Sequence, residues 1–365
     1  MKRFLLAAAF AVMAAVPGAA AGAACSPLNC APNQVPLAGG KLLAVRAGGV
    51  DANVRVLDLQ TGKTRWWLPA GVFGGNLLVH KDGALLTWFD ATTGARVASA
   101  LAGLHGSFSL IGASLDGRRA VLARTEHRRT TFVIVAPFGR QRQIVLGGNT
   151  WSFDALAGDR LYLIRALRNG YQVRLYDLER NRLDPEPLKD PGESALIQGI
   201  AWQRIASPDG RYLLTLYLGG EGNAMVHELD LRAGTARCID LPGAGDFGAA
   251  TSYALALARD GRTLWAISSG YGRVVSIDVG SHRVRSQFSF APGPRNGVAG
   301  IAATAPDGKR IAVSDAQRVW LVEPERRYVA PAIPHVAIAL GFSTDGKRLW
   351  VVGQRSRVSS LPVRA

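Results

Sequence analysis

A short turn element recurs along the chain and restricts its possible folds more than any other feature. Each copy is an Asp-Gly pair followed by a short β-type run, such as RTLWAIS or KRLWVVG. Asp-Gly between alternating apolar runs is a strong hairpin signal, because Gly tolerates positive φ and Asp hydrogen-bonds within its own turn. The copies are Asp116-Gly117, Asp209-Gly210, Asp260-Gly261, Asp307-Gly308 and Asp345-Gly346, with a displaced version at Gly158-Asp159.

A second element closes a later strand of each unit with an acidic residue. Its copies are Asp58, Asp90, Asp177, Asp230, Asp278 and Glu323, with Pro137 filling the slot between Asp90 and Asp177. Successive copies are 32, 47, 40, 53, 48 and 45 residues apart. This period is that of a four-stranded propeller blade.

We therefore expect an all-β protein that forms a single β-propeller domain over residues 34–365, with no long helix after residue 24. Seven closing turns and a partial last unit over residues 336–365 favour seven blades, with eight as the alternative because the unit that holds Asp90 is short. We expect a strand near residues 34–37 to complete the last blade, because a closed ring leaves no open sheet edge.

The N-terminus has the pattern of a secretory signal peptide over residues 1–24. Lys2 and Arg3 precede an apolar run over residues 4–16, and small residues follow it. The run is shorter than the ~20 residues that a transmembrane helix needs, and no later stretch is long enough. We expect an extracytoplasmic protein, secreted or periplasmic, without a transmembrane segment.

Residues 25–33 form a short cysteine-containing segment after the leader. Cys25 and Cys30 are close enough to close a small loop, and a disulfide is reasonable in an exported protein. Lipidation of Cys25 is the less favoured alternative, because Gly22 stands where a bacterial lipobox has a large aliphatic residue.

Residues 259–293 resemble the repeat of the YVTN/lactonase-type propellers, in which a P-D-G-x-x-L-Y-V turn and strand precede a V-x-V-I-D-x-x-T-G strand and turn. Residues 208–243 and 306–331 are looser copies, the first with a WD-repeat-like SPDG entry. Residues 54–71 and 85–103 resemble quinoprotein-type blades, the first with a D-x-x-T-G-K-x-x-W pattern. These resemblances imply an extracytoplasmic propeller superfamily, whose blades occur in binding scaffolds and in enzymes alike.

Polar residues recur 10 or 11 positions before the Asp-Gly turns. If each turn ends the innermost strand of a blade, these residues lie where that strand begins and form one mouth of the central channel. They are His105, Asn149, Gln198, Asn296 and His335. This pattern predicts a binding mouth, and the alternative is that strand starts simply favour polar residues.

Catalysis at this mouth is the rival hypothesis. His105 and His335 are the acid-base or metal-binding candidates of a lactonase-like hydrolase or lyase, and a hard metal ion would need more carboxylates than this mouth supplies. Catalytic residues therefore cannot be assigned. We expect no metal and no cofactor.

Positive charge is the remaining signal. The net charge is +16, and nearly all the excess is arginine. One predicted blade carries a dense group that could attract an anionic ligand, although arginine-favouring codon usage would also produce it. The candidates are Arg118, Arg119, Arg128, Arg129, Arg140 and Arg142.

The sequence therefore favours a monomeric binding or protein-interaction module over an enzyme. The partner would be an unknown protein or an anionic envelope or extracellular ligand. Nucleic acid is a poor partner, because export separates the protein from it and no aromatic residues interleave with the arginines. A lipid-anchored envelope assembly scaffold is a third alternative that depends on Cys25.

Overall fold

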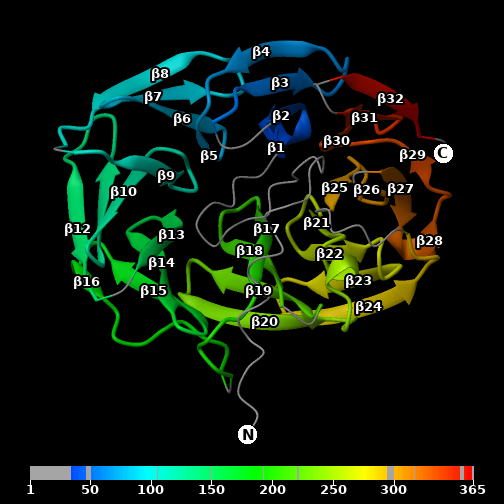
Figure 1. The fold of residues 1–365 in the computed structure, drawn as a ribbon. Coiled ribbons are helices and arrows are strands. Elements are labelled where there is room, and N and C mark those ends of the chain that lie inside the picture. Colours follow the sequence, from blue (N-terminus) through cyan, green and yellow to red (C-terminus); the bar gives the residue numbers. More distant parts are fainter. Residues whose placement is uncertain are drawn as a thin grey trace, which may run out of the picture.

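The computed structural model describes residues 34–46, 51–104, 106–148, 150–191, 193–219, 222–293, 300–315, 317–353 and 357–363. These residues form eight antiparallel sheets arranged as blades around a central axis (Figure 1). The expected leader, Cys25 and Cys30 lie outside the described residues.

Each blade uses its strands in chain order from the axis outwards. The innermost strands are β1 (Gln34–Leu37), β5 (Val72–Gly74), β9 (Ser109–Ala113), β13 (Trp151–Ala157), β17 (Ile200–Ala206), β21 (Tyr253–Leu257), β25 (Ile301–Thr304) and β30 (Ala339–Phe342). The second strands are β2 (Leu42–Arg46), β6 (Leu77–Asp82), β10 (Ala120–Glu126), β14 (Arg160–Leu167), β18 (Tyr212–Leu218), β22 (Thr263–Ser268), β26 (Ile311–Ser314) and β31 (Arg348–Val352).

The third strands carry the acidic ends that the sequence repeats, except in blades three and eight. They are β3 (Val54–Asp58), β7 (Leu85–Asp90), β11 (Arg129–Val135), β15 (Gly170–Asp177), β19 (Ala224–Asp230), β23 (Arg273–Asp278), β27 (Arg318–Glu323) and β32 (Val358–Pro362). The outermost strands are β4 (Thr64–Leu68), β8 (Arg96–Leu101), β12 (Arg142–Leu146), β16 (Arg182–Leu183), β20 (Thr235–Leu241), β24 (Arg283–Ser289) and the pair of short segments β28 (Tyr328–Val329) and β29 (Ile333–Pro334).

The expectation of seven blades is wrong, and the alternative of eight is the one observed. The unit that holds Asp90 is short but forms a complete blade, β5 to β8. The partial last unit is a blade of its own, whose third strand β32 ends at Pro362 instead of an acidic residue. Counting acidic strand ends therefore misses one blade.

Strand β1 does not complete the last blade, which corrects the second part of that expectation. It pairs with β2 in the first blade, from Gln34 opposite Val45 to Leu37 opposite Leu42. The ring instead closes by side-chain packing between the last blade and the first. Trp350 Nε1 donates to the Leu59 carbonyl at 2.7 Å, and Leu340 N donates to Gln34 Oε1 at 2.7 Å.

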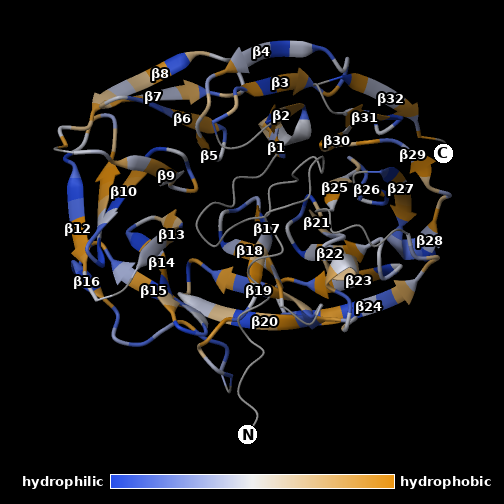
Figure 2. Cartoon of the chain, viewed as in Figure 1, coloured by the Kyte–Doolittle hydropathy of each residue, from blue (hydrophilic) through white to orange (hydrophobic). Residues whose placement is uncertain are grey.

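The core consists of eight apolar clusters, one between each pair of neighbouring blades. Orange stretches accordingly recur in the strands of every blade (Figure 2). Since burying one Leu or Val side chain contributes ~1.5–3 kcal/mol, each interface is strongly stabilised by a few such residues. The ring behaves as one packed body.

Helix contributes little. The only α-helix among the described residues is α1 (Phe247–Ala250), capped by Asp246, whose Oδ1 accepts from Ala249 N at 2.9 Å. The 3₁₀ segments η2 (Ala38–Gly40) and η3 (Pro324–Arg326) are single turns. No described helix has the length and apolar character to cross a membrane.

Antiparallel strands give the ring two distinct faces. The turn face carries the hairpins between first and second strands and those between third and fourth strands. The connection face carries the hairpins between second and third strands, together with the segments that lead from the fourth strand of one blade to the next blade. The Asp-Gly turns and the acidic strand ends therefore share the turn face.

Candidate functional site at the turn face

Two of the five predicted mouth residues can be placed. Gln198 is exposed and follows Ile197, whose backbone exchanges hydrogen bonds of 2.9 and 3.0 Å with Tyr171 on β15. His335 follows β29, and its Nε2 lies 2.7 Å from Ser359 Oγ on β32. Both residues lie on the connection face, between an outer strand and the next inner strand. His105, Asn149 and Asn296 lie outside the described residues.

The structure does not bring Gln198 and His335 together. Gln198 lies at the passage from blade four to blade five, and His335 at the passage from blade seven to blade eight. The residue before each of them pairs with a third strand. Ile197 pairs with Tyr171 of β15, and Pro334 pairs with Arg318 of β27. Gln198 and His335 therefore lie at different blade junctions, and a shared mouth for His105, Asn149 and Asn296 stays a prediction.

The six arginine candidates of blade three divide between the two faces. Arg118 and Arg119 lie in the β9–β10 hairpin, and Arg140 and Arg142 around the β11–β12 hairpin, all on the turn face. Arg128 and Arg129 lie at the β10–β11 hairpin on the connection face. The sequence cluster therefore does not form a single patch.

The acidic residues of the Asp-Gly turns accept hydrogen bonds from other groups of the same turn. In the Asp-Gly hairpins, Asp209 Oδ1 accepts from Ser207 Oγ at 2.5 Å and from Arg211 N at 3.1 Å. Asp345 makes the same pair of contacts, with Ser343 and Lys347 at 2.6 and 3.1 Å. The serine hydroxyl, followed by the backbone donor, lowers the pKa of each carboxyl group.

The acidic strand ends act in the same way. Asp230 Oδ1 accepts from the backbone N of Arg232 and Ala233 at 2.9 and 2.8 Å, while Oδ2 accepts from Arg211 Nε and Nη2 at 2.9 and 2.7 Å. Asp58 likewise accepts from two backbone amides of its turn, at 2.8 and 2.9 Å, and from Arg65. These carboxylates are ionised and already hydrogen-bonded, so they satisfy the backbone of the turn face.

In every blade except the second, a basic residue lies at the end of the innermost hairpin, which joins the first and second strands. In blade two, Asn76 occupies this position. In each hairpin a Gly with positive φ comes first, and the basic residue stands directly after it, or one residue later in the displaced turn of blade four. We call these residues the mouth ring, because innermost hairpins surround the axis. They are Lys41, Arg118, Arg160, Arg211, Arg262, Lys309 and Lys347.

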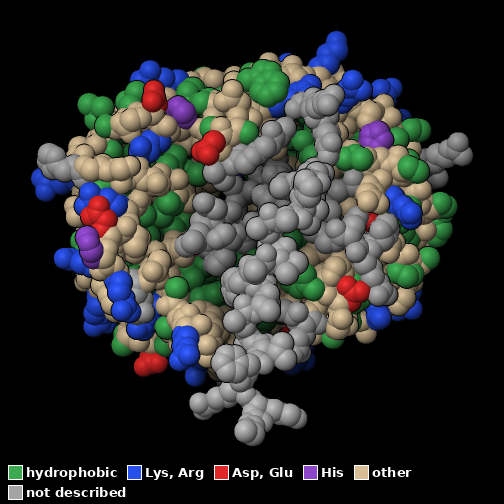
Figure 3. Space-filling model, viewed as in Figure 1, with side chains coloured by type: hydrophobic (Ala, Val, Ile, Leu, Met, Phe, Trp, Pro, Cys, Tyr) green, Lys and Arg blue, Asp and Glu red, His purple; other side chains and the backbone are tan. Residues whose placement is uncertain are grey.

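The hairpins beneath the mouth ring approach one another across the axis. Arg259 Nη2 of blade six lies 3.2 Å from where a Cβ on Gly40 of blade one would stand. A Cβ on Gly210 of blade five would contact Leu115 of blade three at 4.0 Å. On the turn face the described hairpins therefore narrow the channel. In the view of Figure 3, described Lys and Arg side chains are seen along the perimeter of the ring.

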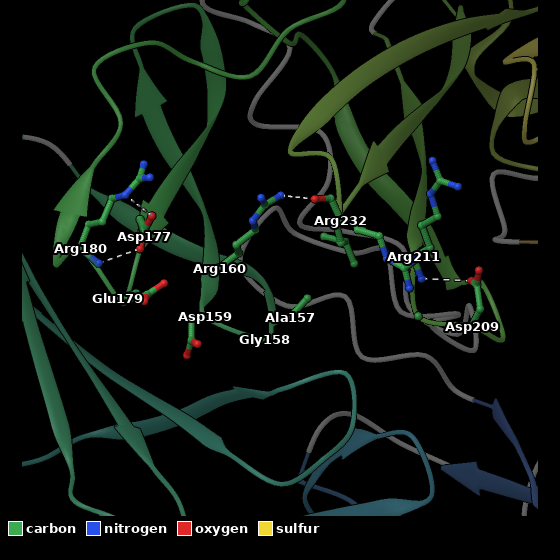
Figure 4. Close-up of a pocket in the computed structure, with 12 residues that line it drawn as sticks. Ala157, Gly158, Asp159, Arg160, Asp177, Glu179, Arg180, Asp209, Arg211 and Arg232 are labelled. Atoms are coloured by element: carbon green, nitrogen blue, oxygen red, sulfur yellow. Dashed lines mark hydrogen bonds and ion pairs between the residues drawn. The ribbon is translucent and has the colours of Figure 1, made fainter.

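A groove of about 570 Å³ opens on the turn face between blades four and five (Figure 4). Four arginines and four carboxylates line it: Arg160, Arg180, Arg211, Arg232, Asp159, Asp177, Asp209 and Glu179. Asp177 and Asp209 bind the backbone N of Arg180 and Arg211 in their own turns, and Asp159 pairs with Arg119 at 3.5 Å. Three of the four carboxylates thus have local partners.

The arginines of the groove differ in their freedom to bind a ligand. Arg160 donates to the carbonyl of Arg232, and Arg211 is fixed by Asp230 and lies 4.7 Å from the ring centroid of Tyr212. Arg180 and Arg232 are exposed, and the contact of Arg180 with Asp177 is long at 3.7 Å. The groove therefore offers two fixed and two accessible guanidinium groups, a geometry suited to carboxylate or phosphate oxygens.

One carboxylate near the turn face caps no turn. Glu228 on β19 is 1% exposed, and its Oε1 lies 2.6 Å from His282 Nδ1 in the β23–β24 hairpin. Burial raises the pKa of Glu228 to about 8, and burial lowers the pKa of His282. The contact between Glu228 and His282 joins blades five and six.

The mouth ring had a signal in the sequence that the search for polar residues before the Asp-Gly turns did not use. The runs that follow the turns begin RR, RY, RT, KR and KR. One basic residue at one position of successive repeats becomes a ring when the repeats close. The groove had no such signal, because its residues come from four turns of two blades. No group of three or more His, Cys, Asp or Glu side chains placed to hold a metal ion occurs among the described residues.

Comparisons with known proteins place the chain by fold alone. No family model matches the sequence, and no curated protein matches it. Among solved structures, AztD of Citrobacter koseri is similar with a TM-score of 0.55 at 12% identity, over 91% of this chain and 90% of that one. The Dos1 propeller has a TM-score of 0.52 at 11% identity, over 91% and 93% of the two chains.

A third similar structure is dihydro-heme d1 dehydrogenase NirN in complex with DHE, with a TM-score of 0.51 at 17% identity, over 93% of this chain and 78% of that one. These neighbours support the β-propeller fold of this chain. The narrower YVTN/lactonase-type resemblance is not confirmed.

Proposed function

We propose that the chain is an exported β-propeller that acts as a binding module, and that its turn face binds a partner carrying carboxylate or phosphate groups. The observation that carries this proposal is the arrangement of charge on that face. Most of its turn carboxylates already accept hydrogen bonds from backbone amides, while the basic residues of the mouth ring and of the groove lie around and between the same turns.

The charged groups of the turn face differ in how many hydrogen bonds they can still make with a ligand. A carboxylate that accepts two or three local hydrogen bonds has few lone pairs left, whereas Arg180 and Arg232 keep accessible donors. Guanidinium groups bind carboxylate and phosphate oxygens with two parallel hydrogen bonds. Clustered positive charge also raises the association rate of an anionic partner, and salt screens that attraction.

Extracytoplasmic location is part of the proposal and rests on the N-terminal pattern. Cleavage between Ala23 and Cys25 would leave a chain that begins at Ala24 or Cys25, and lipidation of Cys25 is the alternative that would make it an envelope-anchored scaffold. Mass spectrometry of the exported chain separates these cases. An intact Met1 on the protein in the cytoplasm would contradict export.

The lactonase-like alternative requires the connection-face residues to converge on one mouth. The two described members, Gln198 and His335, lie at separate blade junctions, and His335 contacts Ser359. The described geometry therefore gives this alternative no observation in its favour.

The binding proposal is tested by matched charge reversal on the two faces. The double variant R180E/R232E changes the groove, and R128E/R129E makes the same charge change on exposed residues of the connection face. Binding of polyglutamate and of polyphosphate is measured for both at several salt concentrations. We expect the groove variant to weaken binding about tenfold, since charge-assisted contacts are each worth roughly 1 kcal/mol or more.

The connection-face variant should bind within about twofold of the unchanged protein, since only long-range attraction is altered there. Preference between polyglutamate and polyphosphate identifies which anionic group the face selects. Equal weakening by both variants would show that binding follows net charge alone and would contradict a site on the turn face.

A further inference from the structure

The two most exposed large apolar side chains among the described residues meet at one place on the outer rim of the ring. Phe138, in the β11–β12 hairpin, is 94% exposed, and Leu101, at the end of β8, is 71% exposed. The twist of each blade turns its fourth strand along the rim, so the end of β8 reaches the start of β12 (Figure 1). Gln141 Nε2 accordingly donates to the Leu101 carbonyl at 2.8 Å. Exposed apolar side chains that gather at one place indicate a contact with another body.

The hairpin that carries Phe138 projects from a well-packed base. Strand β11 is buried from Phe132 to Val135, and its ladder with β12 ends where Ile134 pairs with Arg142. Residues 138–141 lie beyond this ladder and are all exposed. Small-molecule sites are concave, whereas this tip is convex. A convex apolar tip suits a soft surface into which it can sink, such as the interface of a bilayer.

The charge around the tip is positive. The β11–β12 hairpin carries Arg140 and Arg142 and contains no acidic residue. Arg140 is exposed, and Arg142 Nη2 donates to Asn181 Oδ1 at 3.1 Å, in the β15–β16 hairpin of blade four. Asn181 directly follows Arg180, one of the two accessible arginines of the groove. The apolar tip and the groove therefore share one rim of the turn face.

We propose that this rim docks on an anionic lipid bilayer, with Phe138 inserted below the headgroups and Arg140 and Arg180 at the lipid phosphates. This inference rests on the proposed function, because it names the lipid phosphate as the anion that the turn face binds. An apolar anchor and a basic patch reinforce each other at a membrane, since each alone gives only weak and reversible binding. The aliphatic stems of the arginines can also lie along the apolar surface while their charged ends stay in water.

Another exposed aromatic side chain on the turn face lacks this setting. Tyr328 on β28 of blade seven is 49% exposed and also follows a third strand. The turn before it contains Glu323 and Glu325, and Arg326 Nη1 donates to Glu323 Oε2 at 3.2 Å. These carboxylates offset the neighbouring positive charge and would meet an anionic surface unfavourably. Tyr328 is therefore a matched control for Phe138.

Sedimentation with vesicles is the first test. A chain that begins at Ala24 and carries Cys25→Ser has neither the leader nor an attached lipid. We expect it to bind vesicles of phosphatidylcholine with about one third phosphatidylglycerol on the order of tenfold more tightly than phosphatidylcholine alone. Phe138→Ser should weaken binding to the mixed vesicles on the order of tenfold. Tyr328→Ser should bind them within about twofold of the parent chain, because its side chain stays in water.

Soluble polyphosphate separates this proposal from the proposed function. Phe138→Ser should bind polyphosphate within about twofold of the parent chain, because the substitution removes no charge. Polyphosphate binding without vesicle binding overturns the bilayer proposal alone, whereas the absence of both overturns the proposed function as well. Equal vesicle binding by Phe138→Ser and the parent chain also overturns the bilayer proposal. So does self-association that Phe138→Ser removes in a chain that binds no vesicles, because the tip would then dock on a second copy.

Quenching by brominated lipids tests insertion directly. Phe138→Trp and Tyr328→Trp each add one tryptophan to the same native set, and bromine on the acyl chains quenches the indoles that reach below the headgroups. We expect the added fluorescence of Phe138→Trp to fall by about half or more, and that of Tyr328→Trp to stay unchanged. Equal quenching in the two variants overturns insertion of the tip.

Discussion

The two faces of the ring are built on opposite principles. On the turn face the hairpins are short and repetitive, and many of them are held by a carboxylate that accepts hydrogen bonds from the backbone of its own turn. On the connection face the segments between blades vary in length. They are held by contacts that differ from one segment to the next, such as the capped helix α1 or the contact of His335 with Ser359. Repetition on the turn face is what converts one basic residue per repeat into a ring.

The largest expected effect comes from the packing of the turn face. Gly117→Ala should lower the free energy of unfolding by about 3 kcal/mol, because a left-handed φ costs ~1–2 kcal/mol and overpacking adds ~1–3. Gly117 has φ +74, and an added Cβ would overlap the Gly74 carbonyl and lie 2.6 Å from Leu77 Cβ. Denaturant unfolding measures the loss.

Gly83→Ala is the matched control on the connection face. Gly83 has φ +55 in the β6–β7 hairpin, and nothing lies within 4 Å of an added Cβ. Its substitution should therefore cost only the backbone strain, ~1–2 kcal/mol. If the two variants lost equal stability, the turn-face hairpins would not be more tightly packed than those of the other face.

A smaller loss is expected when a turn loses its carboxylate. Asp230→Ala should destabilise the protein by about 2–3 kcal/mol, because it leaves two backbone amides and the Arg211 guanidinium without their acceptor. Chemical denaturation of this variant is compared with Asp82→Ala, which alters an exposed carboxylate at the connection-face end of β6 and should change stability by less than ~0.5 kcal/mol. Similar losses in both would contradict the capping role.

Glu228 provides a pH-dependent prediction of smaller size. Its folded pKa of about 8 lies above the ordinary value of 4.5, so the folded state holds the proton more tightly and stability falls as pH rises from about 4.5 to 8. In Glu228→Gln this loss of stability disappears, so the stability of the variant relative to the unchanged protein increases as pH rises. Thermal melts across this range measure the difference, and a pH-independent difference would contradict the raised pKa.

The positions of the hairpin turns could be predicted from the sequence because turn chemistry is local, although the number of blades could not. Asp-Gly turns and acidic strand ends do mark hairpins on one face, as Asp209 and Asp230 show. The eighth blade was missed because its third strand ends at Pro362 and lacks the acidic marker. Unless the pairing of β1 is known, a complete repeat that lacks the acidic residue cannot be distinguished from a repeat that lacks a strand.

The site was harder to predict because it depends on ring closure. Gln198 and His335 do share a place in the repeat, but an offset along the chain does not say how far from the axis a connecting segment runs. The arginines of blade three are adjacent in sequence, yet antiparallel hairpins send Arg118 and Arg128 to opposite faces. The groove joins turns of two blades, which no local pattern encodes.

We propose that the turn face, and not the connection face, binds an anionic partner. The most direct measurement is amide exchange of the mature protein with and without polyglutamate at low salt. We expect slower exchange in the hairpins around Arg160, Arg180, Arg211 and Arg232, with no change in the β10–β11 hairpin at Arg128. Protection confined to the connection face, or spread evenly over both faces, would contradict it.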